Sequence, residues 1–171
     1  MNKIEYYNTC LDRFNAVEGD LVSADEYKEL IRSLLDIDVL YCVASPTGKT
    51  NRVAKPLAIA HPQFGPSMNI FTSVDKVRPF AEYYGLRDFI ELPRKSSLGD
   101  FYSVFHVCKV IGVRNIIVNE GSAYVGIPVK HLFDFGNLTD RGIIIADDVQ
   151  KYIDGSGNID FSYVPYFKLG V

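Results

Sequence analysis

Apolar side chains recur at helical spacing in two segments at the start of the chain. The first stripe consists of Ile4, Tyr7, Leu11 and Phe14, and Gly19 follows it as a stop signal. The second stripe has the i, i+3, i+4, i+7, i+8 pattern of Tyr27, Leu30, Ile31, Leu34 and Leu35. We therefore expect a helical region over residues 1–35, with Ser23 as N-cap and Glu26 completing a capping box for the second helix.

Short apolar runs bounded by turn residues follow, and such runs are typical of strands. The predicted strands are 38–44, 53–60, 68–71, 86–92, 115–119, 122–126, 142–146 and 159–163. Pro56 predicts an irregularity in the second of these strands. Glu120 and Gly121 predict a hairpin between strands 115–119 and 122–126.

Three further helices are expected between or after these strands. Thr72 and Ser73 can cap a helix that runs to Tyr84, and Pro79 inside it predicts a kink or a break. Segment 96–111 fits either a helix or a strand, and we favour a helix because strict alternation is absent. A short helix is expected from Pro128 to Phe135.

Strands mixed with helices and joined by one evident hairpin predict an α+β fold. We expect a mixed, largely antiparallel sheet with packed helices, because the regular βαβ alternation of a Rossmann fold is missing. The length of 171 residues suits a single domain, 1–171. Its parts are the helical region 1–35, a core 38–135 and a C-terminal extension 136–171.

Charge and composition narrow the expected partners and location. With 18 basic and 21 acidic residues the net charge is −3, which gives no bulk attraction to nucleic acid. No apolar run approaches the ~20 residues that span a bilayer, and no secretory signal is visible, so no membrane association is expected. Cys10, Cys42 and Cys108 are scattered and odd in number, which is typical of reduced thiols in a cytoplasmic protein.

Motifs for catalysis are incomplete, so we predict no cofactor and no metal site. Gly48-Lys49-Thr50 lacks the first glycine and the following helix of a P-loop. His61, His106 and His131 are isolated, without metal-ligand spacing, and are expected to be surface or loop residues. Cys42 and Cys108 fall on predicted core faces, and no serine lies in a nucleophile elbow.

The loop 154–160 looks like the middle of an EF-hand and is expected not to bind calcium. Its first ligand position is Tyr152 and its twelfth is Tyr163, so the bidentate glutamate is missing. Calcium needs ~6–8 oxygen ligands, which this loop does not supply.

Aromatic residues are abundant, with 11 Tyr and 11 Phe. Pairs such as Tyr6-Tyr7 and Tyr83-Tyr84 cannot all be core, and tyrosine is enriched at protein interfaces. This composition predicts that the chain binds a partner protein, either a different protein or a second copy of the same chain.

Two blocks of the chain resemble the SseB-like family, the N-terminal domain of the enhanced-serine-sensitivity protein. One block is residues 68–73 with the helix 74–81 that follows, and the other is the apolar strand 116–118 with Asn119-Glu120-Gly121-Ser122. The family has proline where this chain has Glu120. The resemblance covers residues 38–135 and implies an α/β domain of unknown biochemical role.

We therefore predict an SseB-like cytoplasmic protein that is a non-catalytic protein-binding module. The matching positions of a shared binding surface would be Thr72, Ser73, Asn119, Gly121 and Ser122. The alternative is a small-molecule sensor or enzyme, because polar residues at adjacent strand ends converge on ligands in many proteins. Its pocket would lie near Thr72, Ser73, Asn119 and Ser122.

Overall fold

The computed structural model describes residues 1–46, 48–94, 104–105, 108–109, 112–136 and 167–170. The helical elements are α1 (Lys3–Asn15), the 3-10 turn η1 (Leu21–Ser23), α2 (Asp25–Leu35), α3 (Val74–Tyr83) and α5 (Val129–Phe135). The strands are β1 (Val39–Val43), β2 (Val53–Ala54), β3 (Ala58–His61), β4 (Gly65–Phe71), β5 (Phe89–Pro93), β6 (Asn115–Val118), β7 (Val125–Pro128) and β8 (Phe167–Lys168). The predicted α+β class with a mixed, largely antiparallel sheet is confirmed.

The main sheet has the strand order β5-β1-β4-β6-β7, and β3 also pairs with β4. All these pairs are antiparallel except β4 with β6. Because β6 occupies one edge of β4 at residues 67–70, β3 and β1 share the other edge, at residues 65–68 and 70–71. The parallel pairing brings the C-terminal ends of β4 and β6 to the same edge of the sheet.

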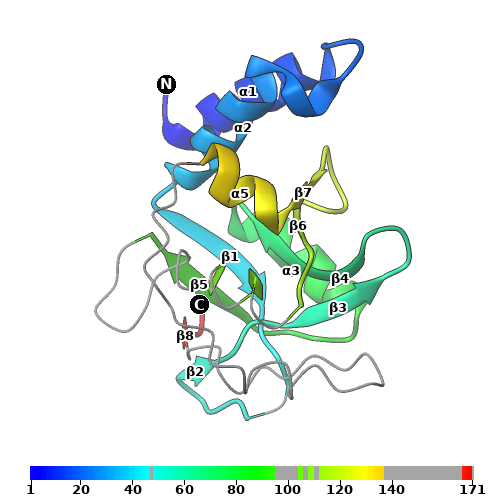
Figure 1. Cartoon of the computed structure of the whole chain (residues 1–171). Helices are drawn as coiled ribbons and strands as arrows, with labels where there is room; N and C mark the ends of the chain where they lie inside the picture. The colour runs from blue at the N-terminus through cyan, green and yellow to red at the C-terminus, as the bar shows by residue number, and fades with distance from the viewer. Residues whose placement is uncertain (47, 95–103, 106–107, 110–111, 137–166, 171) are drawn as a thin grey trace.

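Helices cover both faces of the sheet, with α1, α2 and α5 on one face and α3 on the other (Figure 1). Alternation along β1 explains this arrangement, since successive strand side chains point to opposite faces. Leu40 and Cys42 join the core under α1 and α2, whereas Tyr41 and Val43 pack in the smaller core under α3.

The two N-terminal helices pack on each other and on the sheet through the predicted stripes. All five stripe residues of α2 are buried, and so are Tyr7 and Leu11 of α1. Ile4 is instead exposed, while Cys10 takes a buried position beside Tyr7 and Leu11. Burial of these stripes is the main force that holds both helices on the sheet, because an isolated helix of this length is marginal.

The capping box was predicted at the wrong helix. Ser23 belongs to η1, and α2 begins after Ala24 without a side-chain cap. The Asp20 side chain accepts a hydrogen bond from the N–H of Val22 at 3.2 Å and starts the 3-10 turn, which delays α2. The capping box is found in α1, where Asn2 and Glu5 each accept the other's backbone N–H.

Of the kink or break predicted at Pro79 of α3, the structure excludes the break, and the capping bond expected from Ser73 is also missing. The helix runs without a break from Val74 to Tyr83, through Pro79. Pro79 has no N–H for the carbonyl of Asp75, and Asp75 is an exposed residue, so solvent can replace this hydrogen bond at little cost. Ser73 occupies the N-cap position, yet its side chain makes no capping hydrogen bond.

The remaining predicted elements are present where the structure describes them, but some bounds differ: β5 begins at Phe89 and not at 86, and β7 is Val125–Pro128 and not 122–126. The strand 53–60 divides near Pro56 into β2 and β3, and β6 and β7 form the expected hairpin. Val104, Phe105, Cys108 and Lys109 are helical, and the first three are buried. The predicted strands 142–146 and 159–163, the loop 154–160 and His106 lie outside the described residues.

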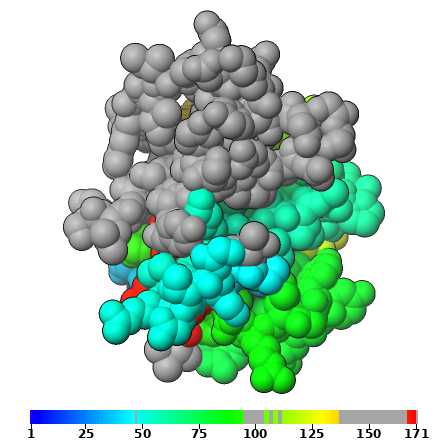
Figure 2. All heavy atoms as spheres, turned by 90° about the horizontal axis from the view of Figure 1, so that it is seen from below, coloured from blue at the N-terminus to red at the C-terminus, as the bar shows by residue number. Residues whose placement is uncertain are grey.

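Strand β8 was not predicted. It pairs antiparallel with β2, and Leu169 forms a bridge with Ile90 of β5. Figure 2 shows residues 167–170 in red between the cyan segment of β2 and the green segment of β5. Within the described ranges, no helix combines the length and the apolar character needed to cross a bilayer.

Candidate functional site

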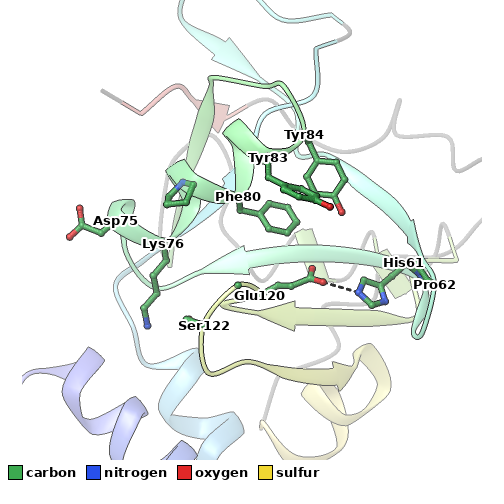
Figure 3. A pocket seen from close by; sticks show the side chains of 11 residues that line it. His61, Pro62, Asp75, Lys76, Phe80, Tyr83, Tyr84, Glu120 and Ser122 are labelled. Carbon is green, nitrogen blue, oxygen red and sulfur yellow. Dashed lines mark hydrogen bonds and ion pairs between the residues drawn. The ribbon is translucent and has the colours of Figure 1, made fainter.

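A cavity of about 580 Å³ lies on the α3 side of the sheet (Figure 3). Its walls come from the β3–β4 turn, from α3 and from the loop after β6. The lining residues are His61, Pro62, Asp75, Lys76, Pro79, Phe80, Tyr83, Tyr84, Glu120, Gly121 and Ser122. The volume falls within the ~300–1,000 Å³ typical of small-ligand sites.

One wall of this cavity is aromatic and consists of Phe80, Tyr83 and Tyr84, which we call the aromatic wall. The ring centroids of Phe80 and Tyr84 lie 5.0 Å apart, and those of Tyr83 and Tyr84 lie 5.2 Å apart in an edge-to-face arrangement. Phe80 also packs on buried Phe71, which fixes the wall to the sheet. Tyr83 is 83% exposed and Tyr84 is 47% exposed, so two large rings stand at the rim of the cavity.

The facing wall presents a carboxylate held by two neutral donors. Nε2 of His61 lies 2.8 Å from Oε1 of Glu120, and the amide Nδ2 of Asn69 donates to Oε2. The Glu120 side chain keeps 22% of its surface exposed. Asn69 is buried, and its own Oδ1 has no hydrogen-bond partner among the described residues. The Asn69 side chain therefore donates to Glu120 through Nδ2, while its Oδ1 accepts no hydrogen bond from the described residues.

The hydrogen bonds of His61 assign its tautomer. Its Nδ1 accepts the backbone N–H groups of Gln63 at 3.1 Å and Phe64 at 3.2 Å. The ring proton is therefore on Nε2, and a neutral imidazole donates to Glu120. Both nitrogens are occupied, so His61 positions Glu120 and has no nitrogen left to accept a proton from a ligand.

The β3–β4 turn that holds His61 is fixed from two further directions. Nδ2 of Asn115 donates to the carbonyl oxygen of Phe64 at 2.7 Å. The Phe64 ring packs directly on Gly126 of β7, where a Cβ atom would come within 2.7 Å of the ring. Only glycine permits this approach without a shift of the ring.

Asn119 joins the ends of the two parallel strands. Its Oδ1 accepts the backbone N–H of Thr72 at 2.9 Å, and its Nδ2 donates to Oγ1 of Thr72 at 3.1 Å. Both residues are almost fully buried, and Asn119 has a positive φ of 61°. We call this pair the Asn119–Thr72 clamp. It fixes the backbone immediately before Glu120.

The five predicted site residues thus divide into two groups. Gly121 and Ser122 line the cavity, next to Glu120. Thr72 and Asn119 use their side chains on each other, and Ser73 is the N-cap residue of α3. Thr72 also lines a second, smaller cavity of about 430 Å³ beside the start of α1. Whether these residues bind a ligand stays a prediction.

The electrostatics of the cavity are dominated by Glu120. Burial raises the pKa of Tyr84, and the negative charge of Glu120 and then Tyr83 add to this. Asp75 and Lys76 also line the cavity, so its lining carries two carboxylates against one ammonium group.

Three candidate nucleophiles, Cys42, Cys108 and Ser122, are not activated in this arrangement. Burial raises the pKa of the Cys42 thiol to about 12 and also raises that of Cys108. Ser122 Oγ donates to the carbonyl oxygen of Asn119 at 3.0 Å. The described part of the chain also holds no group of three or more His, Cys, Asp or Glu side chains placed to bind a metal.

The structure also bears on the predictions for the Gly48-Lys49-Thr50 turn and for the histidines. As predicted, Gly48-Lys49-Thr50 is followed by β2 and not by a helix, and Lys49 pairs with Asp88. The sequence predicted surface or loop positions for His61 and His131, but His61 is the last residue of β3, and both side chains are partly buried and hydrogen-bonded. Nδ1 of His131 lies 2.6 Å from the hydroxyl of Tyr27, so this histidine links α5 to α2.

Sequence reasoning missed the two residues that define the polar wall, His61 and Glu120. They are 59 positions apart, and they meet because the β3–β4 turn lies beside the loop after β6. A signal for the aromatic wall was present, since 75, 79 and 83 and also 76, 80 and 84 follow i+4 rows on one helix face.

Comparison of the chain with protein-family models, with curated proteins and with solved structures gives no significant match in any of the three.

Proposed function

We propose that this protein is a non-catalytic binding module that recognises a partner protein through the cavity between α3 and the loop after β6. The observation that carries the proposal is the pair of exposed tyrosines, Tyr83 and Tyr84, at the rim of that cavity. Tyrosine supplies a large contact area at low entropic cost and is enriched among residues that dominate binding energy.

The chemistry of the cavity supports binding more than catalysis. Both nitrogens of His61 and both carboxylate oxygens of Glu120 already have hydrogen-bond partners. General acid–base catalysis needs a group within reach of substrate that can exchange a proton, and nucleophilic catalysis needs an activated nucleophile. Among the lining residues, His61 has no nitrogen free for proton exchange, and the Ser122 hydroxyl donates to a backbone carbonyl.

The proposal includes a cytoplasmic location and the SseB-like character of residues 38–135. Three free, buried cysteines support the location, since unpaired thiols are typical of reducing compartments. The partner is another protein or a second copy of this chain.

The test is affinity purification of the tagged full chain from native lysate, quantified by mass spectrometry, with light scattering for self-association. We compare the wild type with Tyr83→Ser and with Tyr124→Ser. Tyr124 is 45% exposed but does not line the cavity, which makes it a matched control. A partner that binds through the cavity should be reduced roughly fivefold or more by Tyr83→Ser, equivalent to about 1 kcal/mol, and unaffected by Tyr124→Ser.

The proposal fails if every retained protein is insensitive to Tyr83→Ser and the chain shows no self-association through this surface. A metabolite that shifts the melting temperature in a screen, with no partner found, would favour the small-molecule alternative.

A further inference from the structure

Glu120 carries a negative charge that the described residues leave without a cationic partner. His61 and Asn69 donate hydrogen bonds to it, but both are neutral in this arrangement. No lysine or arginine of the described chain forms an ion pair with Glu120. A partly buried carboxylate without a counter-ion is costly, and a cation from outside would reduce that cost.

The aromatic wall faces the same space and favours the same kind of ligand. Ring faces of tyrosine and phenylalanine attract cations within about 6 Å of the centroid. In the described part of the chain, cations lie over the rings of Phe135, Phe89 and Phe133, but none lies over Phe80, Tyr83 or Tyr84. Figure 3 shows Lys76 extending away from these three rings.

We infer that the cavity accepts the cationic end of an arginine or lysine side chain of the partner, with the charge between Glu120 and the aromatic wall. This inference rests on the proposed protein-binding function and names the group recognised. Arginine fits best, because its planar guanidinium both stacks on aromatic rings and donates to a carboxylate.

The probe is N-acetyl-L-arginine N-methylamide, titrated into the full ¹⁵N-labelled chain and followed by backbone amide shifts. The matched neutral probe is the citrulline analogue, which keeps the shape and loses the charge. We expect shifts in the loop after β6 and in α3, and at least about tenfold weaker binding of the citrulline probe. Added salt should weaken the arginine probe and not the neutral one.

Two variants assign the binding to this cavity. Glu120→Gln should weaken the arginine probe about tenfold. Tyr83→Leu should weaken it severalfold through loss of one ring, and this variant is safe for folding because Tyr83 is 83% exposed. Tyr124→Ser should leave binding unchanged.

Three results would overturn the inference. The two probes could bind equally well, or Glu120→Gln and Tyr83→Leu could leave binding of the arginine probe unchanged. The third is the absence of any shift up to about 50 mM probe, far above the millimolar range of weak sites. If free L-arginine bound about tenfold tighter than the blocked probe, the site would be one for a small amino acid and the partner assignment would be wrong. A partner lost from Tyr83→Ser in the purification, together with a failed probe titration, would retain the proposed function and reject the cation.

Discussion

Replacement of Asn119 by glycine is the sharpest test of how the site is held. The Asn119 side chain accepts the Thr72 N–H at 2.9 Å and donates to Thr72 Oγ1 at 3.1 Å, in a place where both residues are buried. Asn119→Gly keeps the positive φ without strain and removes both hydrogen bonds. The Thr72 N–H is then left buried without an acceptor.

The expected loss is about 1–4 kcal/mol. An orphaned buried donor costs about 1–3 kcal/mol, and the extra freedom that glycine gives the unfolded chain adds about 0.4–1 kcal/mol. With a urea m-value of about 2 kcal/mol/M, the unfolding midpoint should fall by about 0.5–2 M. Urea unfolding followed by circular dichroism measures this directly.

A double-mutant cycle separates the clamp from general destabilisation. Thr72→Val removes the hydroxyl that accepts from Asn119 but keeps the N–H. We expect a coupling energy above about 0.5 kcal/mol between Asn119→Gly and Thr72→Val, and additivity between Asn119→Gly and Tyr124→Ser. A loss below about 0.5 kcal/mol for Asn119→Gly, or no coupling with Thr72→Val, would refute the role assigned to the clamp.

Three further predictions concern tyrosines. Tyr7→Phe should leave the free energy of unfolding unchanged or raise it by up to about 1 kcal/mol, because the buried Tyr7 hydroxyl has no partner among the described residues. Tyr27→Phe should lower the free energy of unfolding by about 1 kcal/mol, because the contact with His131 is lost. Calorimetry of both variants checks this. Burial raises the pKa of Tyr27 to about 12 and also raises that of Tyr7, so the folded protein holds these two protons more tightly than the unfolded chain does. The free energy of unfolding should therefore fall as pH rises from 10 towards 12. Urea midpoints that do not change with pH in this window would contradict the prediction. Glu120→Gln should lower the pKa of Tyr84, because a charge that opposes the tyrosinate is removed, and ultraviolet difference titration against wild type would show no displacement if Glu120 did not act on it.

Elements stabilised by local pattern could be predicted from the sequence. The stripe of α2 is fully buried as its periodicity indicated. The pairing of β6 with β7 was also expected, but their connection spans residues 119–124 and not the two-residue turn 120–121. The short pair β2–β8 could not be predicted, because it joins residues more than 110 positions apart and each strand has only two residues. Pattern gives the face of an element, but long-range pairing depends on the whole fold.

The capping error has a similar cause. Ser23 and Glu26 have the spacing of a capping box, and so do Asn2 and Glu5. The box at Ser23 does not form, because the Asp20 carboxylate starts a 3-10 turn that includes Ser23. Local motifs compete for the same backbone groups, and spacing alone does not show which one prevails.

Sequence reasoning placed candidate polar residues after β4 and β6 but did not indicate the charge found there. Polar residues after β4 and β6 were expected to lie together, and the parallel pairing of those strands puts them at one edge. The charge itself comes from Glu120, whose partners His61 and Asn69 lie on other strands. No periodicity or spacing connects these three positions in the sequence.

Two local costs of the fold meet at Glu120, and this links the architecture to the proposed binding. Asn69 leaves its own Oδ1 unsatisfied in order to donate to the carboxylate, and Asn119 takes a positive φ in the position just before it. Buried unsatisfied groups and unusual backbone conformations persist where function requires them, because selection for stability alone would remove them. A charge held in place by neutral donors, at the cost of an unsatisfied amide, is best explained by a cation that arrives with the ligand.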